Sequence, residues 1–380
     1  MNFGYFRSLK IWIFFYFIFN LQASDYYVAT YGSDNNIGSF DYPFRNVQRA
    51  AEVMEAGDRC LIRQGVYHEA VTIFNQDGSS GSEIEFTNFN DERVVFDGTV
   101  SINSDWQIYS GDIWKTSLEF DIWQLFVNRN EMVMARWPNA NFENGSIWDK
   151  ENHWGHGTID QDEEAYENGT LIDEPHGELD LAQSGLNIVD AIAILNVGSY
   201  KTWTRRVLTH NGNTFTYEPV SEWKTKHHDY YLEGKLEFLD TENEWFFDYE
   251  TRELYFFVPG GANPNELDIR GKTQSYAFEI INSDYITIKN LEFFGTTFRF
   301  HNSDFALVEG CNLYYPSCYK RMLGVIDTIP DISVFTSSSY CRVYKSAFRY
   351  TDLSLIHISE PTRRTPISYA VFCLKKSPQM

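Results

Sequence analysis

Apolar and polar positions repeat with a period of twenty residues in the second half of the chain. Residues 281–288 read Ile-Asn-Ser-Asp-Tyr-Ile-Thr-Ile, and residues 301–308 read His-Asn-Ser-Asp-Phe-Ala-Leu-Val. Apolar residues align in the pairs Ile286 with Ala306, Ile288 with Val308, Leu291 with Cys311 and Phe293 with Leu313. Their spacing of two, three and two positions is typical of strand, bend and strand and excludes a helical repeat. The pattern predicts a parallel β-coil whose inward side chains stack from turn to turn.

A third copy of the repeat follows after a longer loop. Its matches to the second copy, at an offset of 35, are Val343 with Val308, Ser346 with Cys311, Phe348 with Leu313 and Tyr350 with Tyr315. The extra fifteen residues therefore lie between about Pro316 and Thr336. Insertions of this kind project from one side of a coil, where binding clefts are usually built. Asn-Ser-Asp is a frequent turn tripeptide, but turn chemistry does not account for matching apolar positions on both sides.

The region before the repeat predicts a capped beginning of the same coil. Short apolar runs at residues 26–29, 60–62, 71–73, 84–86 and 94–96 predict strands separated by Gly/Asp turns. Asn46 is placed to cap a short helix that Gly57 ends. The apolar face of this helix consists of Val47, Ala50, Ala51 and Met54. One apolar face on one short helix suits a lid over the open end of a coil.

The two ends of the chain differ from the region between them. Arg7 and Lys10 precede the apolar run Ile11–Phe19, and Ala23 offers a small residue for cleavage, so residues 1–23 are predicted to be a signal peptide. The run is too short for a membrane span. An uncleaved anchor and a buried strand are the alternatives. We expect a secreted, periplasmic or cell-surface protein.

Residues 353–380 interrupt the coil pattern in mid-turn and are basic. They resemble translated sequencing-adapter read-through, so we expect an artefactual tail and missing C-terminal coils. A genuine basic tail is the alternative.

The body between these ends is strongly acidic. The whole chain has a formal net charge of −22, and removal of two positive charges with the leader and a net three with the tail leaves −27. Such a body repels nucleic acid and anionic lipid. Four cysteines remain, too few for a disulfide scaffold, and Cys311 at an inward position is expected to be a buried thiol.

Several motifs together resemble the secreted right-handed parallel β-helix proteins of the pectin-lyase-like superfamily. The motifs similar to the opening of these proteins are residues 26–28 (Tyr-Tyr-Val), 32–34 (Gly-Ser-Asp), 43–44 (Pro-Phe), 56–58 (Ala-Gly-Asp), 62–63 (Ile-Arg) and 65–69 (Gly-Val-Tyr-His-Glu). Those similar to its polysaccharide-degrading branch are residues 124–128 (Gln-Leu-Phe-Val-Asn), 135–139 (Ala-Arg-Trp-Pro-Asn), 231–234 (Tyr-Leu-Glu-Gly) and 244–248 (Glu-Trp-Phe-Phe-Asp). The resemblance implies the fold more specifically than the reaction, because this scaffold hosts lyases, hydrolases, esterases and non-catalytic adhesins.

The predicted fold is therefore all-β, a right-handed parallel β-helix with an N-terminal capping helix and a β-rich insertion. The expected divisions are the signal peptide (1–23), the cap and first coils (24–138), the insertion with its return strands (139–266), further coils (267–352) and the tail (353–380).

Candidate substrate-binding residues come from aromatic and basic side chains near the predicted insertion. Trp148 and Trp154 have polar, glycine-rich neighbours, which indicate loop positions where an indole can stack on a sugar ring. Arg136 and Trp137 could clamp a sugar carboxylate and ring, or fasten the insertion to the coil. Lys320 and Arg321, in the inserted loop, could neutralise a substrate carboxylate or form a solvated surface pair.

Two residues are catalytic candidates. His301 replaces Ile281 in the repeat, which puts a titratable group where an apolar one stood; a hydrogen-bonded turn histidine is the alternative. Asp352 ends a turn of the coil after the loop and is expected to face the groove, or to be a turn residue. A hydrolase needs two carboxylates, whereas a lyase needs a base and a cation.

We expect a polysaccharide-degrading enzyme, with a glycoside hydrolase favoured because the acidic body disfavours a polyanionic substrate. A polysaccharide lyase acting on a uronic-acid polymer and a non-catalytic carbohydrate-binding or adhesion protein are the alternatives. No cofactor is required and no metal ligands are assigned, although Ca²⁺ could bind at oxygen-rich turns. The expected partner is a polysaccharide, with no nucleic acid and no membrane span after cleavage.

Overall fold

Three parallel sheets form the body of the protein in the computed structural model, which describes residues 23–103, 105–158, 169–198, 201–219, 228–326 and 332–351. Sheet I consists of β1 (Asp25–Val28), β2 (Arg59–Ile62), β5 (Ile84–Asn88), β24 (Ile286–Lys289), β27 (Leu307–Glu309) and β30 (Arg342–Tyr344). Sheet II consists of β3 (Gly65–Tyr67), β6 (Val94–Asp97), β25 (Glu292–Phe294), β28 (Asn312–Tyr314) and β31 (Ala347–Arg349). Sheet III consists of β4 (Val71–Phe74), β23 (Tyr276–Ile281), β26 (Thr297–His301) and β29 (Val334–Thr336).

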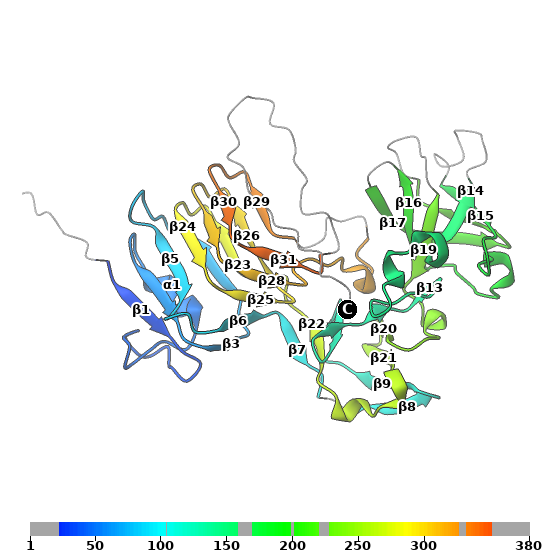
Figure 1. Ribbon diagram of the computed structural model, residues 1–380, viewed down its shortest axis with the longest axis horizontal. Coiled ribbons are helices and arrows are strands. Elements are labelled where there is room, and N and C mark those ends of the chain that lie inside the picture. Colours follow the sequence, from blue (N-terminus) through cyan, green and yellow to red (C-terminus); the bar gives the residue numbers. More distant parts are fainter. Residues whose placement is uncertain are drawn as a thin grey trace, which may run out of the picture.

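The chain passes through these sheets in a fixed cyclic order. From β24 to β31 it visits sheets I, II and III in turn, and each strand lies parallel to its equivalent in the next turn. It leaves after β6 of sheet II and returns at β23 of sheet III, where β23 pairs with β4 and β24 pairs with β5. One long excursion is thus inserted within a single turn of an otherwise continuous three-sheet body (Figure 1).

The stacking predicted from the repeat is confirmed. Ile288 lies beside Val308, which lies beside Val343, and the next strand aligns Phe293, Leu313 and Phe348. Turn residues stack as well, since Ser283 and Ser303 are fully buried and the Ser283 backbone N–H donates to Ser303 Oγ at 3.1 Å. Cys311 is buried in this core and forms no disulfide, and its burial raises the pKa of its thiol to about 12.

The predicted helix at the N-terminal end of the body is present, but the residue that caps its N-terminus is not the predicted Asn46. Helix α1 (Val47–Val53) buries Val47, Ala50 and Ala51 against the core at the end where β1 and β4 lie. Asn46 makes no side-chain capping bond. Instead Glu69, twenty-two residues beyond Val47, accepts the backbone N–H groups of Val47 and Gln48 at 2.9 and 3.1 Å. The helix N-terminus is therefore capped by a tertiary contact that no local pattern reports.

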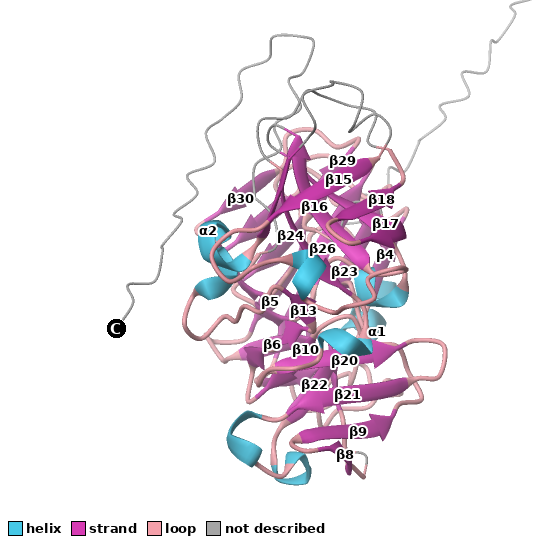
Figure 2. Ribbon diagram, turned by 90° about the vertical axis from the view of Figure 1, so that its right-hand side faces the viewer, coloured by secondary structure: helices cyan, strands magenta, loops and turns pink. Residues whose placement is uncertain are grey.

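The excursion begins and ends in two small sheets. The first consists of β7 (Thr99–Ser101), β10 (Leu125–Val127), β11 (Asn130–Glu131) and β22 (Ile269–Lys272). The second consists of β8 (Gln107–Ser110), β9 (Ile113–Ser117), β12 (Val133–Met134), β20 (Glu244–Asp248) and β21 (Glu253–Phe257). Figure 2 shows the second sheet below the remaining strands of the excursion.

Those remaining strands close into an antiparallel barrel. Their pairing order is β19–β14–β15–β18–β17–β16, and β16 pairs back with β19. The barrel strands are β14 (Gly155–Thr158), β15 (Thr170–Glu174), β16 (Ile192–Gly198), β17 (Lys201–Asn211), β18 (Thr214–Tyr217) and β19 (Asp229–Glu233), and the short β13 (Arg136–Trp137) also pairs with β19. Strand β16 begins at Ile192, two residues after Asp190, which adopts a positive φ of 68°. Inside the barrel, Tyr230 donates a 2.8 Å hydrogen bond to Asp173.

The helices of the excursion and loops are short. They are η1 (Ser146–Trp148), α2 (Lys150–His153), η2 (Leu181–Gln183), η3 (Leu236–Phe238), η4 (Pro259–Gly261), η5 (Pro264–Glu266) and η6 (Arg321–Leu323). Among the described residues, no helix is long and apolar enough to cross a membrane. The predicted leader, apart from Ala23, and the predicted tail lie outside the described residues.

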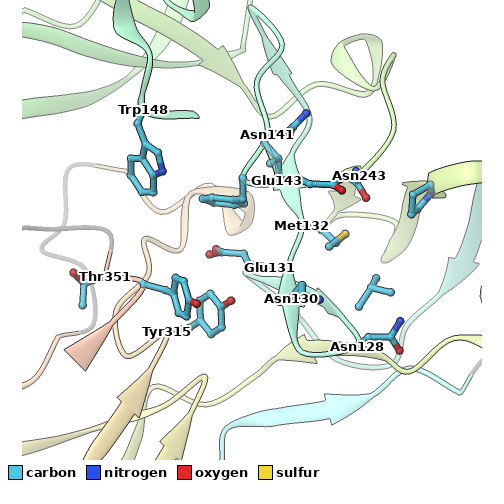
Figure 3. A pocket seen from close by; sticks show the side chains of 15 residues that line it. Asn128, Asn130, Glu131, Met132, Asn141, Glu143, Trp148, Asn243, Tyr315 and Thr351 are labelled. Atoms are coloured by element: carbon cyan, nitrogen blue, oxygen red, sulfur yellow. The ribbon is translucent and has the colours of Figure 1, made fainter. Parts of the chain in front are cut away.

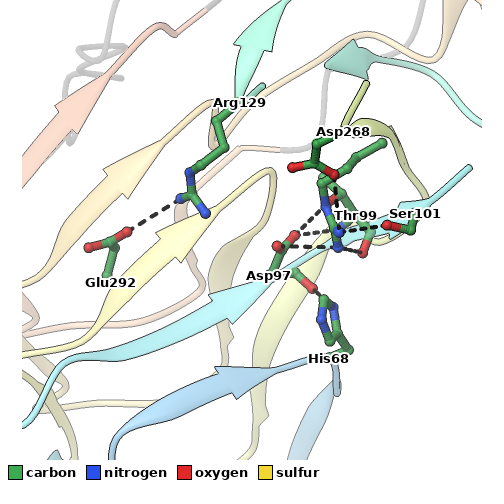
Figure 4. Close-up of polar contacts among 8 residues, drawn as sticks. His68, Asp97, Thr99, Ser101, Arg129, Asp268 and Glu292 are labelled. Atoms are coloured by element: carbon green, nitrogen blue, oxygen red, sulfur yellow. Dashed lines mark hydrogen bonds and ion pairs between the residues drawn. The ribbon is translucent and has the colours of Figure 1, made fainter. Parts of the chain in front are cut away.

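Two arginines hold the first small sheet against the body (Figure 4). Arg270 of β22 donates to Thr99 Oγ1 at 2.7 Å and to Ser101 Oγ at 2.9 Å, and it lies 3.5 Å from the Asp97 carboxylate at the end of β6. Arg129 lies 3.4 Å from the Glu292 carboxylate of β25. These contacts fix the position of β10 and β11, which carry part of the candidate site.

Candidate active site

Two adjoining cavities lie beside the hairpin of β10 and β11. The larger, about 630 Å³, reaches Tyr315, Tyr350 and Thr351 of the body and is called here the coil-side chamber. The smaller, about 340 Å³, reaches Ile194, Thr202, Thr204, Tyr231 and Glu233 of the barrel and is called the barrel-side chamber. The residues that line both are Glu131, Met132, Val133, Phe142 and Trp148. Both volumes fall in the range of small-ligand sites.

A tight hairpin places Glu131 between the chambers. Strands β10 and β11 pair with Val127 opposite Asn130, so Asn128 and Arg129 alone form the turn. Both turn residues have positive φ, 50° and 66°, as the favoured two-residue hairpin turn requires. The register sets Glu131 opposite Phe126, which is fully buried and packs on Phe294 and Tyr315. The pairing with the buried strand β10 therefore fixes the backbone position of Glu131.

The side chain of Glu131 is half-buried and held by Gln124. Gln124 is 3% exposed, and its Nε2 donates to Glu131 Oε1 at 2.6 Å. The backbone of Gln124 is fixed in turn, because its carbonyl accepts the N–H of Lys272 at 2.9 Å. Figure 3 shows the Glu131 carboxylate projecting into the coil-side chamber toward the side where Tyr315 and Thr351 lie.

Uncharged polar groups and aromatic rings make up most of the remaining lining of the coil-side chamber. A second carboxylate, that of the exposed Glu143, also lines it (Figure 3). The amide side chains are those of Asn128, Asn130, Asn141 and Asn243. The Tyr315 and Tyr350 rings stack at 4.7 Å and 14°. No Lys, Arg or His lines this chamber among the described residues.

The barrel-side chamber has aromatic walls, and three cationic residues line it against two carboxylates. Trp123 and Trp154 are 6% and 8% exposed, and the Trp154 ring meets Tyr231 edge to face at 4.7 Å. At one side Arg321 Nε donates to Glu233 Oε2 at 2.7 Å, and a second bond joins Arg321 Nη2 to Glu233 Oε1 at 3.3 Å. This ion pair connects the loop after β28 to the barrel strand β19.

Arg136 is buried and its guanidinium is bonded within the protein. It is 2% exposed, and its guanidinium donates to the carbonyls of Pro138 and His153 at 2.9 Å each and lies over the Tyr231 ring at 3.8 Å. Burial lowers the pKa of Arg136. Arg136 borders the barrel-side chamber, but this bonding is that of a residue that fastens the barrel, the alternative weighed from the sequence.

Glu244 lies beneath Arg136 and is fully buried. Its Oε1 accepts the backbone N–H of Arg136 at 3.3 Å, and its Oε2 has no hydrogen-bond partner in the described part of the chain. Burial, assisted by the negative charge of Asp240, raises the pKa of Glu244 to about 9. The carboxyl is therefore protonated at neutral pH.

Besides Arg136, four predicted substrate-binding residues lie at or beside the chambers. Trp148 is 71% exposed and lines both, while Trp154 and Arg321 line the barrel-side chamber. Lys320 places its Nζ 4.5 Å from the centre of the Trp123 ring. Their roles in substrate binding stay predictions.

Two other predicted residues lie away from the chambers, and one is not described. Trp137 packs on Tyr230 and lines a separate cavity with Pro138 and His176. His301 is an exposed residue at the end of β26 that lines neither chamber. Asp352 lies outside the described residues.

Sequence reasoning missed Glu131, Gln124 and Glu143. Glu131 and Glu143 are two of many carboxylates in an acidic chain, and only the hairpin brings Glu131 to the groove. The motifs at residues 124–128 and 135–139 flank the hairpin, but its turn sequence, Asn128 and Arg129, is no strong hairpin signal. No cluster of three or more His, Cys, Asp or Glu residues that could hold a metal ion occurs among the described residues.

Comparison with known proteins bears on the fold. A solved structure described as a glycoside hydrolase matches with a TM-score of 0.60 and 16% sequence identity, over 77% of this chain and 63% of that chain. The fold is shared with a glycoside hydrolase. At this identity the likeness concerns the fold alone.

Sequence comparison covers shorter stretches. Over 86 residues the chain is 37% identical to the uncharacterized protein YwoF of Bacillus subtilis, and over 90 residues it is 28% identical to pectate lyase PEL9 of Emericella nidulans. These stretches are 22% and 23% of this chain, and the chain spans only about a fifth of the length of either relative, 18% and 22%. No family model matches.

Proposed function

We propose that the protein is a polysaccharide-degrading glycoside hydrolase built on a right-handed parallel β-helix. The proposal includes the expected divisions of the chain, which are the cap and first coils (24–138), the insertion with its return strands (139–266) and the further coils (267–352). It also includes further coils beyond the last of these and export by the leader at residues 1–23. The cyclic passage through three parallel sheets supports the coil, since connections between parallel strands are right-handed in nearly all proteins. Fold likeness to a glycoside hydrolase supports the reaction class only as analogy.

One observation carries the choice of hydrolysis. The coil-side chamber presents two carboxylates, Glu131 and Glu143, with amides and aromatic rings, and its described lining has no cationic side chain. Glycoside hydrolysis needs a pair of carboxyl groups, one acting as general acid. Elimination from a uronic acid needs a cation beside the substrate carboxylate. The lining suits the first reaction better.

Glu131 is the proposed catalytic residue, with Glu143 as its proposed partner. Gln124 restricts Glu131 to one orientation, which is what a group that exchanges a proton with a bound glycosidic oxygen requires. Tyr315, Tyr350 and Trp148 supply the ring faces on which sugars stack.

The test is hydrolysis of a panel of neutral and uronic-acid polysaccharides by the full chain, followed as new reducing ends. We expect Glu131→Gln to lower the rate by at least about a hundredfold, since a positioned acid or base contributes about 10²- to 10⁴-fold. Glu237→Gln, at an exposed position in η3, is the matched control and should keep full activity. Equal rates for both variants would exclude Glu131.

A polysaccharide lyase is the second candidate, because one matched stretch belongs to a pectate lyase and basic residues border the barrel-side chamber. Elimination would create a double bond that absorbs ultraviolet light, whereas hydrolysis would not. Binding of a polysaccharide without either product would identify a non-catalytic carbohydrate-binding protein.

A further inference from the structure

A third cavity lies on the other face of β13 from the barrel-side chamber. Side chains alternate along a strand, so Arg136 borders the barrel-side chamber while Trp137 lines this third cavity. It has a volume of about 590 Å³ and is called here the Trp137 cavity. Its other walls include the end of helix α2 and the turn at residues 176–179. None of its lining residues lines either chamber, so it is separate from the proposed active site.

Hydrogen bonds hold the walls of the Trp137 cavity in place. Asn139 joins three segments, because its carbonyl accepts from His153 Nδ1 at 2.7 Å and its Nδ2 donates to Asp240 Oδ1 at 2.7 Å. In the turn at residues 176–179, the backbone groups of His176 and Leu179 exchange two hydrogen bonds of 2.9 Å each, which close the turn. The cavity is therefore largely pre-formed, as ligand sites in proteins usually are.

The polar atoms that the cavity leaves for a ligand are mostly acceptors. A carbonyl can only accept, so Nδ1 of neutral His153 carries the proton and its Nε2 is left as an acceptor. Asp240 Oδ2 and the exposed carboxylate of Glu178 make no hydrogen bond in the described part of the chain. No Lys or Arg lines the cavity among the described residues. A ligand that fits must therefore bring hydrogen-bond donors and no negative charge.

An apolar surface lies beside these acceptors. The Trp137 ring is half-buried and packs on Tyr230 with the ring centroids 6.0 Å apart, and Pro138 and Leu179 also line the cavity. A neutral sugar matches both surfaces, because its hydroxyl groups donate and its ring has an apolar face that an indole can cover. A uronate matches them less well. Its carboxylate only accepts, and its charge would lie near the carboxylates that line the cavity.

We propose that the Trp137 cavity is a second saccharide-binding site, which takes one sugar unit without a negative charge. The inference goes beyond the proposed function, because this cavity shares no lining residue with the chambers and its occupation requires no cleavage. On a polysaccharide, the site anchors one part of the polymer to the barrel while another part reaches Glu131.

The indole N–H resonance of Trp137 reports binding at this cavity directly. Trp137→Phe identifies that resonance in the ¹H–¹⁵N spectrum of the full chain. The probes are methyl β-glucopyranoside, methyl β-xylopyranoside and methyl β-galactopyranoside, with the sodium salts of methyl β-glucuronide and methyl β-galacturonide for comparison. We expect the resonance to move with at least one neutral glycoside and with neither uronate. Movement with a uronate, or with none of the probes, would overturn the proposal.

Glu178→Ala and a matched control, Glu237→Ala, locate the bound sugar. Both carboxylates are exposed, but Glu178 lines the cavity and Glu237 of η3 does not. Glu178→Ala should weaken the binding of the neutral glycoside about three- to tenfold, as loss of one hydrogen bond does. Glu237→Ala should bind it with the affinity of the wild type. Equal affinities of the two variants would place the sugar elsewhere and contradict the proposal.

The outcomes also separate the inference from the proposed function. Binding at Trp137 without cleavage of any polymer would keep this site and reject the hydrolase. Cleavage by a chain whose Trp137 resonance does not move would keep the hydrolase and reject this site.

Discussion

At the scale of a single residue, the buried carboxyl of Glu244 gives folding a pH dependence. In the unfolded chain its pKa is about 4.3, whereas burial raises it to about 9 in the folded protein. Between these pH values the unfolded chain releases the proton and the folded chain keeps it. The contribution of Glu244 to the free energy of unfolding is thus fully present below about pH 4. It is lost as pH rises toward 9, by up to about 1.4 kcal/mol per pH unit.

Glu244→Gln removes this ionisation. We expect the variant to have the wild-type free energy of unfolding near pH 4 and a higher one at pH 8, measured by urea unfolding at several pH values. Glu237→Gln, which changes an exposed carboxyl, should follow the wild-type profile. If the Glu244→Gln curve also runs parallel to that of the wild type, Glu244 is ionised in the folded protein.

Only some residues of the candidate site could be anticipated from the sequence. The glycine-rich, polar neighbours of Trp148 agree with its exposure of 71%, whereas Trp154 has similar neighbours and is only 8% exposed. Glu131 could not be anticipated, because its turn, Asn128 and Arg129, contains no glycine and gives no strong hairpin signal. Its approach to Tyr315 depends on pairing and packing between segments far apart in the chain.

At the scale of elements, helix α1 depends on a cap supplied by another segment. Glu69→Ala should lower the free energy of unfolding by about 1 kcal/mol, since the N–H groups of Val47 and Gln48 lose their acceptor. Chemical denaturation measures this loss. Asn46→Ala is the comparison, and it should cost only a few tenths of a kcal/mol, because Asn46 makes no side-chain capping bond. The reverse order would restore Asn46 as the cap.

The coil strands were predictable because their inward residues recur at matching places. The excursion was harder to delimit, since its strands β7 to β13 are as short as those of the three parallel sheets. Their pairing with strands more than a hundred residues away, such as β9 with β21, decides where they belong. The register between such distant strands cannot be read from the sequence of either strand alone.

At the scale of the whole molecule, the ion pair of Arg321 and Glu233 joins the barrel to the loop of the body. The side chains of Arg321 and Glu233 are 15% and 5% exposed. Arg321→Met should therefore lower the free energy of unfolding by about 2–3 kcal/mol, because it leaves a largely buried carboxylate without its cation. Hydrogen exchange should also quicken in β19, as mass spectrometry of the native protein can measure.

The double variant Glu233→Gln, Arg321→Met should recover part of that loss, since no unpaired charge remains. Arg49→Met is the surface control. Its partner Glu52 is half exposed, so the cost should stay below about 0.5 kcal/mol. Equal costs for Arg321→Met and Arg49→Met would mean that the barrel is held by other contacts.

The entry and exit of the barrel lie next to each other, since Arg136 of β13 pairs with Glu233 of β19. Just outside them, Val133 of β12 pairs with Glu244 of β20. A chain whose ends meet in this way can be lengthened, shortened or exchanged without rerouting its host. The barrel therefore has the geometry of an inserted domain that can be exchanged without disturbing its host. A related chain could exchange the barrel while the three-sheet body and the hairpin that carries Glu131 stay in place.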